Sequence, residues 1–436
     1  MSTKKNSKAP AEVSVTNQTN PKSENPSERK TRITWGIILI LVGFFMILVF
    51  GGPAQKGLIT TFNMNLAHSQ AIEIPSIVLP TQLSVYILAI TLIFFGAYQL
   101  ARGIKSIGLL IGVLSFCFVS GFLIWATADK AFNLEGMLSN TLVRATPILL
   151  AALCGVISER AGVTNIGIEG TMLFSAQTAV ITATLTKNLY IGLIVAIVTG
   201  GLVAAIHATL SIKYRVNQII SGTAINILGT GLTSFFQSKF LEKYGDLLNN
   251  SGTFPIISIP LLSKIPVIGP IFFESNIIVY LALILVLVIH FLLFYTPWGL
   301  RTRAVGEHPK AADTLGVNVY LMRYVNVILG GMIAGLGGAY FTIGSVGRFD
   351  QIMTAGKGFI GLAAMIFGKW TPIGAFLSSL IFGFADSLQI KLQILSVPIP
   401  TEFLQMTPYI ITIIVLAGVV GRAMPPAADG EPYEKQ

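Results

Sequence analysis

The amino-acid sequence predicts an all-α polytopic membrane protein with about 12 transmembrane segments. Of its 436 residues, 53% are hydrophobic and only 11% are charged, and the mean hydropathy is +0.74. Soluble domains carry about 25% charged residues, so this chain cannot cover a water-facing surface. Its apolar stretches are long and continuous, which favours helices over the short alternating segments of an outer-membrane barrel.

A polar N-terminal stretch precedes the apolar runs. Residues 1–32 are rich in Lys, Ser, Asn, Thr and Pro, so we expect a disordered cytoplasmic tail. No small-residue cleavage site closes the first apolar run, so the stretch is not expected to be a signal peptide. The run at 358–369 is short for a span and predicts a half-helix or part of a broken helix. The apolar runs lie at 33–51, 83–101, 107–127, 142–158, 163–185, 189–212, 218–238, 275–296, 324–346, 358–369, 371–390 and 404–421.

Charged residues indicate the orientation. If the N-terminus is inside, most of the 29 Lys and Arg residues fall on the inner side of the membrane, where such residues are retained. Both termini are therefore expected in the cytoplasm, with residues 422–436 as a second tail. The formal net charge of +10 then reflects topology, and no nucleic-acid partner is expected.

Sequence motifs of enzymes and metal sites are missing. The chain has no nucleotide-binding loop ending in Lys and Ser or Thr, no His-Glu-x-x-His helix and no Gly-x-Ser-x-Gly elbow. Its two cysteines, Cys117 and Cys154, lie in separate apolar runs and lack the spacing of a zinc site. We therefore expect no catalytic residue, no metal site and no ATP hydrolysis by this chain.

Residues 159–170 (Glu-Arg-Ala-Gly-Val-Thr-Asn-Ile-Gly-Ile-Glu-Gly) combine glycines with polar side chains. Non-helical backbone at membrane depth is tolerated only against protein or a water-filled cavity. Asn165 and Glu169 lie one helical turn apart, and a buried Glu is costly unless it faces such a place. One interpretation is a bend beside a transport path. The other places the segment at the inner interface, where Glu is readily solvated.

A second interruption lies in residues 356–374, where Gly-rich stretches divide an apolar region. Gly-interrupted segments in both halves of a chain are typical of the central site of inverted-repeat transporters. Asp386 follows in the next run and should face the bundle interior, unless it lies at the outer interface. Asn226, polar within an apolar run, is expected to bond across helices or to line a path.

The inner loop at 297–323 predicts a docking element. Its residues 307–317 indicate a short helix that begins near Pro309 and ends at Gly316, because Pro is favoured in a first turn and Gly after a last turn. A short helix at the cytoplasmic face suits contact with a partner protein. An amphipathic connector that only closes the bundle is the alternative.

Three segments resemble one family of transport proteins, and the similarity extends from Leu142 to Gly421. They are similar to the inner-membrane permease subunits of the ATP-binding-cassette (ABC) importers for branched-chain amino acids, ribose and nucleosides. The nucleoside branch is the most similar, through Asn-Ile-Gly-Ile-Glu-Gly at 165–170 and Phe-Ala-Asp-Ser-Leu-Gln at 384–389. The three segments are residues 159–170, the loop from Arg301 to Val317 and the stretch from Gly356 to Gly374.

The resemblance implies a ten-helix permease core at 107–421, preceded by two additional transmembrane helices within 33–106. Its cytoplasmic loop 300–317 would couple the chain to an ATPase. The implied partners in the bacterial cytoplasmic membrane are an ATP-binding ABC subunit that binds ATP and Mg, a second homologous permease, an extracellular substrate-binding lipoprotein and membrane lipids. The coupling residues would be Glu307, Lys310, Ala311, Ala312, Asp313 and Gly316. Replacing Ala312 with Asp is expected to uncouple transport while leaving assembly and membrane insertion largely intact.

The resemblance also implies that the cargo is a nucleoside. Nucleosides are neutral, so their path needs hydrogen-bonding and stacking groups more than fixed charge. A simple sugar such as ribose is an alternative cargo. An ATP-independent secondary transporter is an alternative class, in which the intramembrane carboxylates would be proton sites. The candidate path residues are Asn165, Glu169, Phe174, Asn226 and Asp386.

Overall fold

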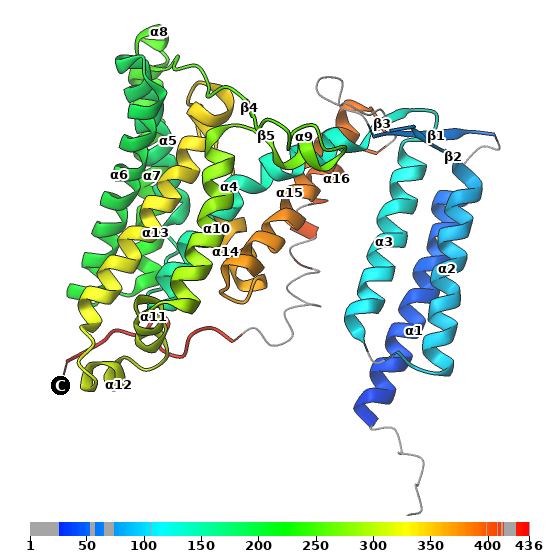
Figure 1. Cartoon of the computed structure of the whole chain (residues 1–436), viewed down its shortest axis with the longest axis horizontal. Coiled ribbons are helices and arrows are strands. Elements are labelled where there is room, and N and C mark those ends of the chain that lie inside the picture. The colour runs from blue at the N-terminus through cyan, green and yellow to red at the C-terminus, as the bar shows by residue number, and fades with distance from the viewer. Residues whose placement is uncertain are drawn as a thin grey trace, which may run out of the picture. The chain divides into compact units, whose positions relative to one another are not determined.

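The structure is a computed structural model of the chain (Figure 1). It describes residues 26–52, 57–64, 74–104, 106–397, 399–407, 409–410, 413 and 424–435. The chain divides into two compact units. The first comprises Met1–Thr60 and Leu79–Asp129, and the second comprises Thr61–Val78 and Lys130–Gln436.

The first unit is built from three apolar helices and a π-helical turn. Helix α2 packs against both α1 and α3. Gly43 on α1 lies so close to α2 that an added Cβ would be 2.9 Å from the carbonyl oxygen of Ala89. A small residue is therefore needed for the two helices to approach this closely. The elements are α1 (Pro26–Met46), η1 (Ile47–Gly51), α2 (Thr81–Ala101) and α3 (Ile107–Ala126).

Helix α1 begins earlier than the sequence predicts. Residues 26–32, assigned to the polar tail, are helical, and the remaining tail residues lie outside the described residues. Pro26 opens the helix and Glu28 lies in its first turn. Pro at a first turn and a negative charge near the positive end of a helix both favour this start, despite the polar composition.

Helix α3 also differs from expectation. A permease core beginning at residue 107 would include α3, yet α3 packs with α1 and α2 and belongs to the first unit. The predicted pair of additional N-terminal helices is therefore a group of three in the structure. Hydropathy indicates that α3 spans a membrane, but the apolar composition of a helix does not indicate which other helices it contacts.

The second unit contains the two segments in which glycines and polar residues interrupt apolar runs, residues 159–170 and 356–374. Strand β3 (Ala131–Asn133) pairs in parallel with β1 (Ile59–Asn63), with Thr61 opposite Ala131, and leads into α4 (Leu134–Arg160). Asn133 caps α4, because its side chain accepts a hydrogen bond from the Gly136 amide at 2.7 Å. The other elements of the chain are β2 (Ile77–Pro80), α5 (Ile168–Thr186), α6 (Leu189–Ala208), η2 (Thr209–Lys213), α7 (Gln218–Phe236), η3 (Gln237–Leu241), α8 (Gly245–Leu248), β4 (Ile257–Ser258), α9 (Ile268–Phe272), β5 (Glu274–Ser275), α10 (Ile277–Tyr295), α11 (Pro297–Glu307), α12 (Pro309–Thr314), α13 (Val319–Phe341), η4 (Thr342–Val346), α14 (Lys357–Phe367), α15 (Pro372–Ile394) and α16 (Thr401–Gln405).

Helices α4 and α13 lie at the centre of the second unit. Helix α13 packs against α4, α5 and α6, and α4 also packs against α14 and α15. Gly200 on α6 and Gly331 on α13 allow the backbones to touch, since a Cβ on Gly200 would be 2.2 Å from the Gly331 carbonyl oxygen. Such small-residue contacts are how membrane helices approach most closely. The α6–α13 pair is therefore a tightly packed part of the bundle.

Nine helices within the described ranges are long and apolar enough to cross a membrane. Helix α14 is apolar but has only 11 residues, which confirms a short helix in the run at 358–369. The last predicted run, 404–421, lies largely outside the described residues. The chain is thus a multi-pass, predominantly helical membrane protein, as the sequence predicts.

Candidate functional site

A bend at residues 161–167 separates α4 from α5. Helix α4 ends at Arg160 and α5 begins at Ile168, and the backbone between them is not helical. Gly162 has a φ of +77°, a conformation that glycine adopts readily. Asn165 is only 3% exposed. The predicted break is therefore real, and it is packed against protein.

Glu169, in the first turn of α5, caps a different helix. Its Oε1 accepts hydrogen bonds from the Gly356 amide at 2.8 Å and from the Thr354 hydroxyl at 2.5 Å. Its Oε2 accepts a hydrogen bond from the Gly358 amide at 2.6 Å. Helix α14 begins at Lys357, and its N-cap residue Gly356 has no side chain that could cap it. Glu169 supplies the acceptors and negative charge that a helix N-terminus favours.

Asn226 on α7 holds the other side of the bend. Its Nδ2 donates to the Ile166 carbonyl oxygen at 2.9 Å, and its Oδ1 accepts from the Gly170 amide at 2.8 Å. These bonds satisfy two backbone groups that the broken helix leaves without partners. Gly229 allows the approach, because a Cβ there would be 2.7 Å from the Gly170 Cα. The prediction that Asn226 bonds across helices is confirmed.

Asp386 on α15 forms an ion pair with the first residue of α14. The Lys357 Nζ lies 2.9 Å from the Asp386 Oδ1, and the two side chains are 16% and 12% exposed. Asp386 therefore faces the bundle interior, as predicted. Lys357 was not among the predicted site residues. The rule that charges inside a membrane protein pair with one another could have pointed to it.

Four of the five predicted path residues belong to one connected polar region. They are Asn165, Glu169, Asn226 and Asp386. Asn165 lies inside the bend, with its Nδ2 3.5 Å from the Sγ of Cys154. The fifth residue, Phe174, is half-buried on α5 and offers an aromatic face instead. The region joins α5, α7, α14 and α15, so the two Gly-interrupted segments of the sequence meet in space.

The last residues of α4 hold the turn between α14 and α15. The Glu159 Oε2 accepts a hydrogen bond from the Trp370 Nε1 at 2.6 Å, and the Arg160 Nε donates to the Trp370 carbonyl oxygen at 2.9 Å. Lys369 and Trp370 have φ values of +54° and +52°, which bulky residues rarely adopt. Sequence reasoning missed this contact, because Glu159 and Trp370 are 211 positions apart and only the fold brings them together.

Helix α12 is the short helix that the sequence predicts in the inner loop. It begins at Pro309, its N-cap His308 accepts a hydrogen bond from the Ala311 amide at 3.1 Å, and Gly316 follows it with a φ of +83°. Leu315, directly after the helix, is 85% exposed. Among the predicted coupling residues, the exposed ones are Glu307, Lys310, Ala311 and Gly316.

Ala312 faces the interior of the chain, unlike the exposed coupling residues. It is 3% exposed and belongs to a cluster with Val305, Val319 and Tyr433. An Asp at this position would be buried among apolar groups, which is strongly unfavourable. The expectation that Ala312→Asp uncouples transport while leaving assembly and membrane insertion largely intact is therefore revised, because the charge would also destabilise this cluster. Asp313 is half-buried on the same helix.

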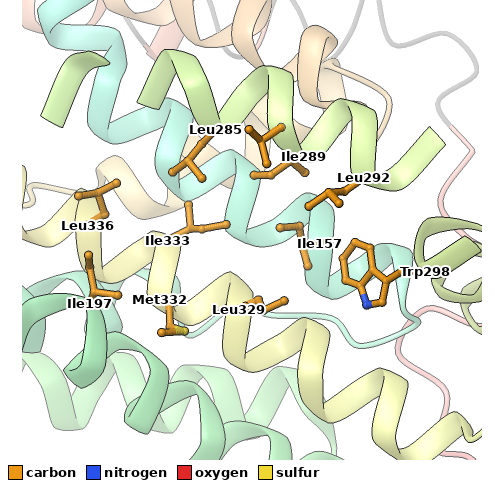
Figure 2. Close-up of a pocket in the computed structure, with 11 residues that line it drawn as sticks. Ile157, Ile197, Leu285, Ile289, Leu292, Trp298, Leu329, Met332, Ile333 and Leu336 are labelled. Carbon is orange, nitrogen blue, oxygen red and sulfur yellow. The ribbon is translucent and has the colours of Figure 1, made fainter. Parts of the chain in front are cut away.

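An open apolar cavity of about 250 Å³ lies among α4, α6, α10, α11 and α13 (Figure 2). Its lining offers the Trp298 indole as its one hydrogen-bonding side chain, so it does not suit a cargo rich in polar groups. None of the five path candidates lines it. The lining residues are Ile157, Ile197, Leu285, Val288, Ile289, Leu292, Trp298, Leu329, Met332, Ile333 and Leu336.

Residues 137–416 match the family described as branched-chain amino acid transport system / permease component. The chain belongs to this family. It is 41% identical over 312 residues to the nucleoside ABC transporter permease protein NupC of Lactococcus lactis, covering 70% of this chain and 98% of that relative. It is 44% identical over 314 residues to the guanosine ABC transporter permease protein NupQ of Bacillus subtilis, with coverages of 68% and 95%.

A more distant relative of the permease is the glucose ABC transporter permease protein TsgB13 of Haloferax volcanii. It is 28% identical over 260 residues, covering 56% of this chain and 67% of that protein. No solved structure matches the permease. The family match begins at residue 137, inside α4, so α1 to α3 precede the matched part of this permease.

Proposed function

We propose that this permease is the membrane subunit of an ATP-driven ABC importer and that its cargo is a nucleoside. The observation that carries the proposal is the similarity to NupC and NupQ, which extends over 98% and 95% of their lengths. Those relatives are named for nucleoside and guanosine transport. The amide groups of the polar region and the half-buried ring of Phe174 on α5 suit a neutral cargo with many hydrogen-bonding groups.

An ATP-binding subunit would contact α12, which we name the coupling helix. Lys310, Ala311 and Leu315 are exposed on or beside it, and an apolar side chain as exposed as Leu315 suits a protein contact. ATP and Mg would be bound by that subunit, so this chain would perform no hydrolysis. A second homologous permease and an extracellular binding lipoprotein would complete the importer. The coupling helix and both termini would then lie in the cytoplasm.

Motion of the coupling helix would reach the bend through α11. Gly306, near the end of α11, lies against the end of α4: a Cβ there would be 2.2 Å from the Arg160 carbonyl oxygen. Such a contact cannot be compressed, so a push on α11 displaces the end of α4 and the bend that follows it. Helix α5 begins directly after the bend, and Glu169 in its first turn caps the start of α14. ATP-driven closure of the ATPase would thus alter access to the path.

The polar region would form part of the path wall. Glu169 and Asn226 already use their polar atoms to hold α14 and the bend, so we assign them a shaping role. Phe174 has a half-exposed ring that could stack on a base. Asn165 and Asp386 would contribute polarity to the same wall.

Uptake measurements test this function. Labelled uridine and guanosine would be supplied to cells with and without the chain, under ATP depletion and separately under an uncoupler at constant ATP. We expect uptake to need the chain and ATP and to withstand the uncoupler. Uptake abolished by the uncoupler at constant ATP would contradict the ABC mechanism and favour a secondary transporter.

A sugar is the second candidate cargo, because TsgB13 is named for glucose transport. Unlabelled glucose and ribose would be added in excess to the uridine assay. We expect neither to reduce uridine uptake, whereas unlabelled nucleosides should reduce it. Competition by a sugar, together with uptake of that labelled sugar, would replace the nucleoside proposal.

A further inference from the structure

The C-terminal segment, residues 424–435, joins α11 to the bend. The Ala428 amide donates a hydrogen bond to the Gly306 carbonyl oxygen at 2.9 Å. The Asp429 Oδ1 accepts a hydrogen bond from the Thr164 hydroxyl at 3.1 Å. Figure 1 shows the segment in red, passing beside α11 and α12. The C-terminal segment is thus hydrogen-bonded to both α11 and the bend, which are the two parts through which motion would travel.

Arg323, near the start of α13, is only 1% exposed and takes its partners from the same segment. Its Nη1 donates to the Glu431 carbonyl oxygen at 2.9 Å. The negative charges of Asp429 and Glu431 attract its guanidinium group. A buried arginine without opposite charges is strongly unfavourable. The docked position of the segment is therefore part of the folded core.

Tyr433, near the end of the segment, packs against the coupling helix. It is 5% exposed and packs with Ala312 of that helix and with Val319 of α13. Its ring lies 5.3 Å from the ring of Tyr320, in an edge-to-face arrangement that favours both rings. The backbone carbonyl oxygen of Tyr433 accepts a hydrogen bond from the Tyr320 hydroxyl at 3.4 Å. The inner face of the coupling helix thus rests on the C-terminal segment.

The coupling helix needs contacts with other parts of the chain to keep its position. It has six residues, and helices this short are unstable unless they pack against something. We propose that the C-terminal segment positions the coupling helix against α11, α13 and the bend, with Tyr433 as the positioning residue. The segment makes the loop stiff, so that a push by the ATPase moves the bend instead of deforming the loop. This inference rests on the coupling role proposed for α12.

Three substitutions separate this role from a general effect of changing the C-terminus. Tyr433→Ala removes the buried anchor. Glu434→Ala changes the next residue, whose side chain is 67% exposed and pairs with the exposed Arg215. Tyr433→Phe keeps the ring and removes only the hydroxyl. All three would be made in the full chain, assembled with its ATPase and partner permease.

The first measurement is amide hydrogen exchange of residues 309–316, which does not depend on transport. We expect several-fold faster exchange in Tyr433→Ala, and unchanged exchange in Glu434→Ala and Tyr433→Phe. The second is nucleoside uptake per ATP hydrolysed in proteoliposomes. We expect a several-fold loss in Tyr433→Ala alone, because ATP is still hydrolysed while less motion reaches the bend.

The outcomes distinguish this inference from the proposed function. Unchanged exchange of residues 309–316 in Tyr433→Ala would overturn the positioning role whatever the cargo is. Uptake and hydrolysis that fall in equal proportion would also overturn it, because they indicate loss of assembled protein. If the unmodified complex carries no nucleoside, the proposed cargo fails, and the exchange result still decides the role of Tyr433.

Discussion

The carboxylate of Glu169 lies 2.6 Å from the amide nitrogen of Gly358, so a side chain on α5 caps the first turn of α14. Helix α14 has no side-chain cap of its own, and its N-cap residue is a glycine. A charged cap supplied by another helix ties the two together more strongly than apolar packing alone. The first turn of α5 and the start of α14 are therefore expected to move as one body.

Glu169→Gln should destabilise the permease. A Gln side chain places an NH₂ group against donors that now face carboxylate oxygens, leaving at least one of them unsatisfied. We expect the free energy of unfolding to fall by about 1–3 kcal/mol, and uptake to fall with it. Thermal unfolding of the purified protein measures the change. The exposed Glu242 provides the control Glu242→Gln, and equal midpoints for the two variants would contradict the capping role.

Gly358→Ala should be destabilising for steric reasons. An added Cβ would lie 2.6 Å from the Glu169 Oε2 and 2.8 Å from its backbone nitrogen, so the cap would be pushed away. Gly231→Ala is the matched control, because a Cβ there meets nothing within 4 Å and alanine favours a helix over glycine by about 1 kcal/mol. We expect a lower unfolding midpoint for the first variant and an unchanged or higher one for the second. The reverse order would refute the close contact.

The Lys357–Asp386 pair should show strong coupling in a double-mutant cycle. Lys357→Met or Asp386→Asn alone leaves one buried charge without its partner, at a cost of about 3 kcal/mol. Changing both removes the charges together, so the double variant should be more stable than the sum of the single changes predicts. Unfolding free energies of the four proteins measure the coupling. Additive single effects would mean that the two charges do not interact.

The two faces of the coupling helix should respond differently to a negative charge. Ala311→Asp and Leu315→Asp alter exposed positions, so we expect normal unfolding midpoints but weaker association with the ATP-binding subunit. Ala312→Asp places the charge in an apolar cluster, so we expect a lower midpoint as well. Co-purification and thermal unfolding are measured on the same samples. A normal midpoint for Ala312→Asp would show that its side chain is not buried.

Docking of the C-terminal segment should weaken as the pH rises. Burial raises the pKa of Asp429 from 3.8 to about 6, while the hydrogen bond from Thr164 acts in the opposite direction. The docked state therefore binds the proton more tightly, and this stabilisation is lost as the pH rises from about 4 to about 6. The ionisable groups near Asp429 are Glu159 and Arg323, and the positive charge of Arg323 acts against the rise in the pKa of Asp429.

Hydrogen exchange of residues 427–433, corrected for its intrinsic pH dependence, measures this docking. We expect stronger protection at pH 5 than at pH 7.5. Asp429→Asn should reduce the difference, because a neutral amide does not titrate. Equal protection at both pH values in the unmodified permease would contradict a raised pKa at this position.

Part of this site could be predicted from the sequence because the signals are local. Glycines and charges inside an apolar run marked the bend, and Pro309 and Gly316 marked the ends of α12. The partners could not be predicted, because Glu169 and Gly358 are 189 positions apart. The sequence also could not show that Ala312 faces inward. A six-residue helix is too short for the spacing of its apolar residues to indicate which face is buried.

The start of helix α14 and the turn after its end are both hydrogen-bonded to side chains within residues 159–169. Glu169 holds its start, and Glu159 and Arg160 hold the turn that follows it. One inserted residue would lengthen a helix by 1.5 Å and rotate everything after it by about 100°. One of these two contacts would then be lost, even if every side chain were kept. The structure therefore fixes the number of residues between these two contacts, and insertions or deletions tolerated by this permease should fall outside residues 356–370.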